Sequence, residues 1–383
     1  MAPSATPAQG RLMSASRFAP PSPRPEIADS GLTRPDWVGN NPRDPGKLWL
    51  DKNENTDPAM IELVRSVIAS VPADAGFTYP DLGPVYRKLA PMVGVPPQCL
   101  LLTPGSDGAI RAVFEAYIAP GDKVLHTVPT FAMYGVYARM YGAQVTGLEY
   151  RPSNAGPVLH ADDVVAAIAT SKPKLVGLPN PDSPTGTVFS QADLRRIIEA
   201  AGEGGALILI DEAYYPFHAE TVLPWVMEYP HLVVCRSTGK AWGMAGVRVG
   251  YAAAHPDVAV MLHKVRAMYE VGALSAAVFE RMLDHEDAMR ESVARISAGK
   301  AHFLAAMDEL GFQTLKGQGN FLHVAFGARA EAIHAALAPQ VYYRKDFAEP
   351  CLKGFSRFSA TTAELFNPVI EAIRDVVKGE GQS

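Results

Sequence analysis

The sequence predicts an α/β protein in which helices cover both faces of a mostly parallel sheet, with a smaller α+β unit after it. Three observations support this prediction. Apolar runs and helical patterns alternate from residue 100 to residue 252. The runs are apolar throughout, which is typical of strands buried on both faces. The chain of 383 residues is also long enough for two domains.

Residues 1–47 predict an N-terminal arm, because they are rich in Pro, Ala, Ser and Gly and lack an apolar period. Two alternatives remain for this arm: it is a dispensable tail, or it packs on another subunit. Ordered structure is expected from Leu48. Residues 48–75 predict the N-terminal part of the small domain, including a helix over Pro58–Ser70 whose apolar residues share one side.

Residues 76–272 predict the large domain. A short helix is expected over 84–90, opened by a proline. The following patterns predict strands at 100–103, 123–128, 144–148, 174–178, 206–210, 232–235 and 248–252, and helices at 108–117, 132–141, 161–169 and 191–201. Because ligands of such sheets lie beyond the carboxyl ends of the strands, the polar residues at those ends are the candidate site residues.

Residues 273–383 predict a linking helix and the C-terminal part of the small domain. One long helix is expected over roughly 273–310. Shorter patterns predict strands at 312–315, 320–326, 341–344 and 355–359, and helices at 329–337 and 363–377.

The composition argues against several classes of function. The net charge is −5 and there is no dense block of Lys or Arg, so neither nucleic acid nor an anionic membrane is an expected partner. No apolar run approaches about 18 residues, and the first residues lack the apolar core of a secretion signal. Cys99, Cys235 and Cys351 are far apart and show no metal-ligand spacing, which favours a reducing, cytoplasmic location and no metal site.

Lys240 is the first candidate catalytic residue, because it ends a polar turn that follows the apolar run 232–235. Most lysines in such positions are solvated, so position alone is weak support. The Ser237-x-x-Lys240 spacing occurs in penicillin-binding enzymes, but the Ser-Asp-Asn and Lys-Thr-Gly tripeptides of that family are absent. Gly239-Lys240 also lacks the upstream glycine and the following Ser or Thr of a phosphate-binding P-loop. The remaining interpretation is a lysine that forms a Schiff base.

Other strand ends carry polar or aromatic residues that suit a ligand. Ser106 and Asp107 open a helix, where free N–H groups and the helix dipole favour a phosphate. Phe131 follows the next strand and is placed to stack on a flat ring. Asp211 and Tyr214 end a later strand, and a carboxylate buried there requires a cation or a donor. Each has a plainer alternative: a helix cap, a core aromatic or a solvated acid.

Taken together and in this order, the motifs from Leu50 to Val377 resemble the fold type I pyridoxal-phosphate (PLP) enzymes. Among these, the likeness is to class I/II aminotransferases of the histidinol-phosphate aminotransferase branch. The resemblance implies that Lys240 forms the Schiff base and then moves the α-proton. It also implies that Asp211 pairs with the pyridinium nitrogen and that Tyr214 donates to the ring oxygen. PLP would supply the electron sink, and the protein would supply placement and electrostatics.

The same resemblance assigns further residues to the cofactor. Phe131 would stack on the ring. The residues assigned to the phosphate are Ser106, Asp107, Ser237 and Arg248. Tyr79, in Tyr-Pro-Asp, would reach the phosphate of the neighbouring subunit, which implies a homodimer with shared active sites.

On the substrate side, the resemblance assigns two arginines and matches Asn320-Phe321 to a pair of the same branch. Arg357, in Arg-Phe-Ser-Ala-Thr, would clamp the substrate carboxylate or an equivalent anion in bidentate fashion. Arg344, thirteen residues earlier, would be a second arginine for a substrate anion.

Departures from the family pattern bear on the substrate. Ser183 stands where the asparagine of Asn-Pro-Thr-Gly usually contacts the ring oxygen, and serine is a shorter donor. Thr56 and Asp57 follow Asn55 where a proline and an aromatic or small residue are usual. Asn55 and Asp57 are therefore expected to face the substrate, and a carboxylate there suits an amine or hydroxyl better than a phosphate. The sequence thus predicts a relative with a changed substrate.

The expected function is that of a PLP-dependent aminotransferase that moves an amino group between a small amino compound and a 2-oxo acid through a Lys240 Schiff base. A phosphorylated, histidinol-phosphate-like donor is one candidate. The alternative from the same branch is a PLP-dependent decarboxylase of a phospho-amino acid. A third hypothesis is a non-catalytic effector-binding domain, which would need a DNA-binding helix-turn-helix that the proline-rich arm does not supply.

Overall fold

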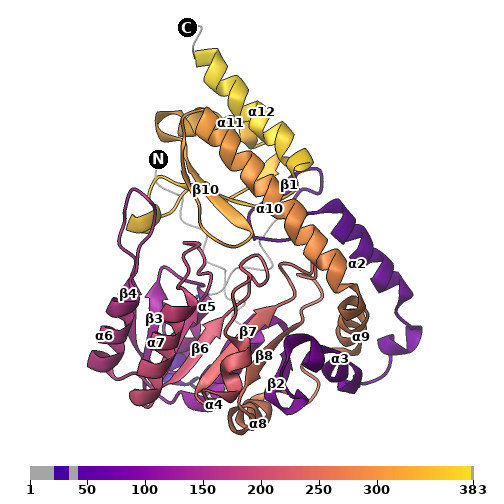
Figure 1. Ribbon diagram of the computed structural model, residues 1–383, viewed down its shortest axis with the longest axis vertical. Helices are drawn as coiled ribbons and strands as arrows, with labels where there is room; N and C mark the ends of the chain where they lie inside the picture. The colour runs from indigo at the N-terminus through magenta and orange to yellow at the C-terminus, as the bar shows by residue number, and fades with distance from the viewer. Residues whose placement is uncertain (1–20, 34–41, 381–383) are drawn as a thin grey trace, which may run out of the picture.

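A computed structural model of the chain describes residues 21–33 and 42–380 (Figure 1). The remainder of the predicted arm, 1–20 and 34–41, lies outside the described residues. Within 21–33 a short helix, α1 (Pro25–Ala28), lies next to α5 (Met133–Met140) of the same chain. Arg24 donates from Nη2 to the Met140 carbonyl over 3.4 Å, and Arg139 Nε lies 3.5 Å from an Asp29 carboxylate oxygen. This part of the arm therefore contains a helix, which its composition did not predict.

A seven-stranded sheet forms the centre of the larger unit, in the order β2-β8-β7-β6-β5-β3-β4. Its strands are β2 (Leu100–Thr103), β3 (Lys123–Val128), β4 (Gln144–Glu149), β5 (Leu175–Pro179), β6 (Leu207–Asp211), β7 (Leu232–Ser237) and β8 (Gly250–Ala254). β8 runs antiparallel to both of its neighbours, and the other adjacent pairs are parallel. The prediction of a mostly parallel sheet is confirmed.

Helices cover both faces of this sheet, and successive residues of a strand bury into different cores. In β6, Ile208 and Ile210 belong to one core, whereas Leu207 and Leu209 belong to the other. The first core is closed by α2 (Pro58–Ser70), α3 (Gly83–Val93), α6 (Ala161–Ser171), α7 (Gln191–Glu203) and α9 (Ala273–Met282), and the second by α4 (Gly105–Tyr117), α5 and α8 (Pro256–Val265). Burial on both faces explains why the strands are apolar throughout.

A smaller unit with its own core lies above the seven-stranded sheet in Figure 1. Its antiparallel sheet has the order β12-β10-β9, and a separate pair joins β1 to β11 in parallel. Its elements are β1 (Leu48–Trp49), β9 (Gln313–Leu315), β10 (Phe321–Ala325), β11 (Val341–Tyr342), β12 (Ser356–Ser359), α10 (Glu286–Glu309), α11 (Ala330–Leu337) and α12 (Ala363–Glu380). The β1–β11 pair brings the segment around Leu48 into this unit, beside residues about 290 positions later in the chain. The exact domain boundaries stay predictions.

The single helix predicted over roughly 273–310 is wrong, because the chain forms α9, a 3₁₀ turn at Leu283–His285, and then α10. His285 leaves the helical region with φ −117° and ψ 34°. The break has a packing reason. Phe279 and Met282 bury into a core of the large sheet, whereas Phe303 and Met307 bury into the core of the smaller unit. A single straight helix would not direct the apolar residues of its first half into the large-sheet core and those of its second half into the core of the smaller unit.

The remaining short elements are 3₁₀ turns at Ala73–Gly76, Pro97–Cys99, Leu223–Met227, Gly327–Arg329 and Pro350–Leu352. Within the described residues, no helix is both long and apolar enough to cross a bilayer. The parallel register sets Pro179 beside Asp211 and Asp211 beside Cys235, so the carboxyl ends of β5, β6 and β7 form one edge. The candidate site lies at that edge.

Candidate active site

One cavity at the carboxyl edge of the large sheet brings together most of the residues that the sequence singled out. Its wall includes Ser106, Asp107, Phe131, Ser183, Asp211, Tyr214, Ser237, Lys240 and Arg248. These residues come from five segments spread over more than 140 positions, yet each follows or ends a strand. The topology therefore places them at one site, as expected for a parallel sheet.

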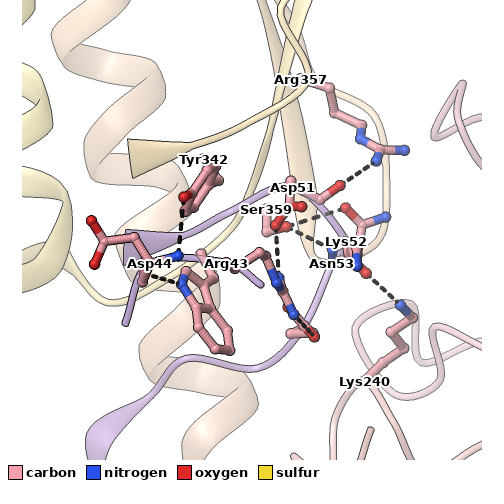
Figure 2. Close-up of polar contacts among 11 residues, drawn as sticks. Arg43, Asp44, Asp51, Lys52, Asn53, Lys240, Tyr342, Arg357 and Ser359 are labelled. Carbon is pink, nitrogen blue, oxygen red and sulfur yellow. Dashed lines mark hydrogen bonds and ion pairs between the residues drawn. The ribbon is translucent and has the colours of Figure 1, made fainter. Parts of the chain in front are cut away.

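Lys240 lies in the turn after β7 and points toward the segment that follows β1 (Figure 2). Its Nζ donates to the Lys52 carbonyl over 2.9 Å and lies 5.9 Å from the centroid of the Tyr214 ring. Burial lowers the pKa of Lys240 to about 8, and the positive charges of Arg357 and Arg248 act in the same direction. Glu54 and Asp211 oppose this shift. The amine is thus far easier to deprotonate than an exposed lysine.

Two side-chain hydroxyls hydrogen-bond to the backbone in and next to the turn that carries Lys240. Thr238 Oγ1 donates to the Val249 carbonyl over 2.6 Å, and the Gly239 N–H donates to Ser237 Oγ over 3.1 Å. Thr238 is fully buried. The first bond ties the turn to the residue just before β8 and the second lies within the turn, so together they restrict the position of Lys240.

Asp211 is the last residue of β6 and is only 4% exposed. Its Oδ1 accepts from the Ala213 N–H over 3.0 Å, and burial raises the pKa of its carboxyl to about 6. Tyr214 follows in the next turn, where its hydroxyl accepts from Asn53 Nδ2 over 2.9 Å. The Tyr214 ring packs edge-on against Phe321 at 5.2 Å between centroids. A buried carboxylate of this kind is stabilised by a cationic partner in the cavity.

The opposite end of the cavity suits an anion. Gly105 starts α4 with φ +76°, and a Cβ built there would lie 2.9 Å from Arg248 Nη2. A Cβ on Gly250 would lie 2.4 Å from the Gly105 carbonyl carbon. Glycine at both positions lets the helix start, Ser237 and the Arg248 guanidinium come close together. Free N–H groups, the helix dipole and a guanidinium favour a phosphate here.

Of the two candidate substrate arginines, Arg357 lies on β12 of the smaller unit, and Arg344 lies two residues after β11, where it forms an isolated antiparallel bridge with Arg357. Their backbones pair, with Arg344 N donating to the Arg357 carbonyl over 3.0 Å and the reverse bond at 2.8 Å. Arg357 Nη2 donates to the Asp51 carbonyl over 2.9 Å (Figure 2). Its Nε is buried and has no hydrogen-bond partner within residues 21–33 and 42–380. The Arg344 guanidinium lies 3.9 Å from the centroid of the Phe347 ring. Neither arginine belongs to the wall of the main cavity.

Tyr79 does not reach the cavity of its own chain. Its side chain is 78% exposed and stacks on Tyr269 with 4.3 Å between ring centroids. The predicted contact with a phosphate would therefore have to be made in a neighbouring subunit.

Asn55 and Asp57 were expected to face the substrate, and the structure directs both side chains elsewhere. Asn55 Nδ2 donates to the Ala241 carbonyl over 3.0 Å and to Ser292 Oγ over 3.1 Å. Asp57 is 2% exposed, caps the first turn of α2 and lies 2.7 Å from Arg295 Nη2. A carboxylate that is already paired and capping a helix is not free to bind an amine. These bonds do not support the substrate contacts predicted for Asn55 and Asp57, which stay predictions.

The sequence interpretation missed the role of the segment from Asp51 to Glu54, which it described only as a turn. The Lys52 and Asp51 carbonyls accept from Lys240 and Arg357, and Asn53 contacts Tyr214. Asn53 has φ +55°, a conformation that asparagine tolerates better than most residues. The run of Asp and Asn was the signal that could have indicated this bend, although it does not name the partners.

Arg43 was also missed. It donates to both oxygens of Glu54 over 2.7 and 2.8 Å and to Asp51 over 2.9 Å. Its guanidinium carbon lies 4.0 Å from the centroid of the Trp49 ring. Arg43 lies in the segment predicted as an arm, and no sequence pattern marked it.

Among the described residues, no group of three or more His, Cys, Asp or Glu side chains is arranged to hold a metal ion.

Comparison with known proteins agrees with this geometry. Residues 45–373 match the family model described as aminotransferase class I and II. A histidinol-phosphate aminotransferase of Symbiobacterium thermophilum is 32% identical over 347 residues, covering 87% of this chain and 91% of that protein. Histidinol-phosphate aminotransferase 1 of Burkholderia lata is 35% identical over 300 residues, covering 77% and 82%.

Among solved structures, the histidinol-phosphate aminotransferase of Sinorhizobium meliloti in complex with pyridoxal-5′-phosphate superposes with a TM-score of 0.74. It is 20% identical to this chain, and the match covers 87% of this chain and 91% of that one. At this identity the match supports the fold. The family model and the relatives go further: the chain belongs to the class I and II aminotransferases, and it is a transaminase that uses pyridoxal 5′-phosphate.

Proposed function

We propose that this transaminase is a cytoplasmic homodimer that moves an amino group between a small phosphorylated amino compound, similar to histidinol phosphate, and a 2-oxo acid. The observation that supports it best is the pair of adjacent arginines, Arg344 and Arg357, above a cavity that already holds a Schiff-base candidate, Lys240. Two guanidinium groups on one side of a site favour a substrate with two anionic groups.

The cavity fits the cofactor on two grounds. The Asp211 carboxylate is buried and its hydrogen-bond partners are the Ala213 N–H and the Cys235 side chain, both uncharged, so a protonated ring nitrogen would supply the missing cation. At the other end, the approach of Arg248 to Gly105 leaves no room for a Cβ, as a tight phosphate cradle requires. We assign Ser106, Asp107, Ser237 and Arg248 to the phosphate, Phe131 and Ser183 to the ring, and Tyr79 to the phosphate of the partner subunit.

Bound PLP supplies an electron sink for negative charge at the substrate carbon. Lys240 supplies the proton transfer. With a pKa of about 8, about a tenth of its amine is neutral at pH 7 and able to accept a proton at Nζ. With the cofactor bound, Asp211 would hold a proton on the ring nitrogen, and Tyr214 would donate from its hydroxyl to the ring oxygen. Each group acts from a fixed position on a strand end.

Substrate anions would be bound from the smaller unit. Arg357 Nη2 now contacts the Asp51 carbonyl, a neutral acceptor. A substrate carboxylate or phosphate would replace that carbonyl with a stronger, charge-assisted partner and would also satisfy the buried Nε. Arg344, whose backbone pairs with that of Arg357, would bind the second anionic group.

An exposed apolar cluster supports the homodimer. Phe77 is 80% exposed and Tyr79 78%, and Tyr79 stacks on Tyr269, which belongs to a second segment where Met268 and Leu274 are also exposed. Several large apolar side chains in one surface region are typical of a protein interface. The free, buried cysteines Cys99, Cys235 and Cys351 support the cytoplasmic location.

The other two hypotheses are less favoured. A phospho-amino-acid decarboxylase does not agree with the relatives, which are named aminotransferases. The same names, with a complete set of strand-end residues around Lys240, argue against a non-catalytic effector-binding domain.

The test is a donor screen with the purified protein and PLP, read by the absorbance of the bound cofactor. Histidinol phosphate should convert the cofactor to its amine form and outperform histidinol, because only the former carries a phosphate for the arginines. Carbon dioxide release without a keto product would instead support the decarboxylase. Equal use of both donors would contradict the proposed substrate class, and sedimentation of Tyr79→Ala beside wild type would test the dimer.

A further inference from the structure

Asp182 is a fully buried carboxylate just beyond β5, next to the cavity residue Ser183. Three side-chain hydroxyls donate to it. Thr127 Oγ1 donates to Oδ2 over 2.6 Å, Tyr150 OH donates to Oδ2 over 2.8 Å, and Thr130 Oγ1 donates to Oδ1 over 2.8 Å. The Ser183 N–H donates as well. All four donors are uncharged.

These donors come from separate parts of the chain. Thr127 lies on β3, Thr130 in the loop after it, and Tyr150 directly after β4. The Asp182 backbone closes its own loop, because its N–H donates to the Thr187 carbonyl over 2.9 Å and its carbonyl accepts from Gly186 over 2.7 Å. Asp182 therefore joins the carboxyl ends of β3, β4 and β5 through hydrogen bonds.

Two cavity residues are direct neighbours in sequence of this cluster. Phe131 follows Thr130, and Ser183 follows Asp182; both line the cavity. The Ser183 hydroxyl in turn interacts with the Tyr214 phenol. We infer that Asp182 is a positioning residue for transamination, which fixes the Phe131 and Ser183 walls of the cavity by accepting hydrogen bonds from Thr127, Thr130 and Tyr150.

The charge on Asp182 suits this role. An ionised carboxylate accepts several hydrogen bonds, whereas its protonated form has to donate one and so forces a hydroxyl to turn. Burial raises the pKa of Asp182 to about 7 against the effect of its donors. The titratable side chains that interact with it are Tyr134, Tyr150 and Cys351, and all three are neutral near pH 7. The complete set of bonds is therefore present above pH 7 and is lost as the pH falls below it.

The experiment compares wild type with Asp182→Asn and Tyr150→Phe, with Glu149→Gln as the matched control. Glu149 is an exposed carboxylate one residue before Tyr150. The measurements are the pH dependence of kcat/KM, the visible circular dichroism of the bound cofactor and the melting temperature. The dichroism needs no amino donor, so it tests this inference even if the proposed phosphorylated substrate, on which the kinetic readout rests, is wrong.

Wild type should show an ionisation near pH 7 that raises kcat/KM on the alkaline side and changes the dichroism. In Asp182→Asn that ionisation should be absent. At pH 8 its kcat/KM should be about tenfold lower than that of wild type, because the cavity walls are slightly displaced. Tyr150→Phe should move the ionisation up by about one pH unit, because the charged form loses one donor. Glu149→Gln should behave as wild type.

A lower melting temperature in Asp182→Asn with an unchanged pH profile and unchanged dichroism would overturn the inference, because a purely structural role predicts that pattern. If Asp182→Asn does not fold, Tyr150→Phe and Thr127→Val decide the question. Both remove one donor and leave the carboxylate, and an unshifted ionisation in both would likewise overturn it.

Discussion

Lys240 Nζ lies 2.9 Å from the backbone carbonyl oxygen of Lys52, so the amine of the large sheet is held by a segment of the smaller unit (Figure 2). The same segment holds Arg357 through the Asp51 carbonyl. The Schiff-base lysine and the candidate substrate arginine therefore share one short piece of backbone. A displacement of this backbone segment is expected to affect both substrate binding by Arg357 and proton transfer by Lys240.

The first prediction concerns Lys240 itself. Lys240→Ala should lower turnover by about 10³-fold or more, because no other described amine in the cavity wall replaces the base. Lys52→Ala is the matched control. Lys52 is exposed and contributes its backbone carbonyl, so this variant should keep activity within about threefold of wild type. Single-turnover absorbance of the cofactor provides the measurement, and substantial turnover by Lys240→Ala would contradict the assignment.

A second prediction concerns stability without cofactor. Burial lowers the pKa of Lys240 from 10.5 to about 8, so the folded state binds this proton less tightly than the unfolded chain. The loss of stability is fully present below pH 8 and is relieved as the pH rises toward 10.5. Lys240→Met should therefore stabilise the cofactor-free protein at pH 7 by on the order of 1–3 kcal/mol.

Urea unfolding at pH 7 and at pH 10 checks this sign. The gain of Lys240→Met should shrink at the higher pH, whereas Lys52→Met should show no pH-dependent gain. An equal gain in unfolding free energy for Lys240→Met at both pH values would mean that Lys240 is not desolvated in the folded state.

The third prediction tests the phosphate cradle. Gly105→Ala should weaken PLP binding by about tenfold or more, because the new Cβ would meet Arg248 Nη2 at 2.9 Å. Gly94→Ala is a close control: φ is +74° there against +76° at Gly105, but no atom lies within 4 Å of the built Cβ. Both variants should lose about 1 kcal/mol or more of stability from the backbone conformation. Equal PLP affinity in the two variants would contradict the assignment of Gly105 and Arg248 to the phosphate site.

Asp57 should behave as a structural residue. Asp57→Ala removes a helix cap and leaves Arg295 without its carboxylate at 2.7 Å, so a loss of about 1–3 kcal/mol of unfolding free energy is expected. Arg295 is partly exposed, which keeps the expected loss below that of a fully buried pair. The KM for the amino donor should stay within about twofold of wild type. A large KM change without loss of stability would restore Asp57 as a substrate residue.

The last prediction concerns Arg43 and Glu54. Arg43→Met leaves the Glu54 charge unpaired near Lys240, so the pKa of Lys240 should rise, and the ionisation of Lys240 near pH 8 in the kcat/KM profile should move to higher pH, whereas that of Asp182 near pH 7 should stay in place. Glu54→Gln should move the Lys240 ionisation to lower pH, and the double variant should return toward wild type because both charges are gone. Trp49 fluorescence should report loss of the stacked guanidinium. Unchanged pH profiles in both single variants would show that neither charge acts on Lys240.

Much of the candidate site could be predicted from the sequence because it is built from strand ends. Asp211 ends β6, and Ser237 and Lys240 end or follow β7. A buried parallel strand is a local apolar pattern, and its carboxyl end always points to the ligand edge of the sheet. Spacing within one strand and its turn is fixed by covalent geometry, so the positions of these residues could be predicted without knowledge of the rest of the fold.

The sequence alone therefore determined the sheet, its helices and the residues at its ligand edge. Only the tertiary structure decided that Asp57 pairs with Arg295, 238 positions away, that Lys52 offers its carbonyl to Lys240, and that α9 and α10 part at His285. These outcomes depend on how the smaller unit packs against the larger one. Such contacts join residues that are distant along the chain and chemically ordinary, and nothing in a local pattern of apolar and polar residues records which partner each will meet.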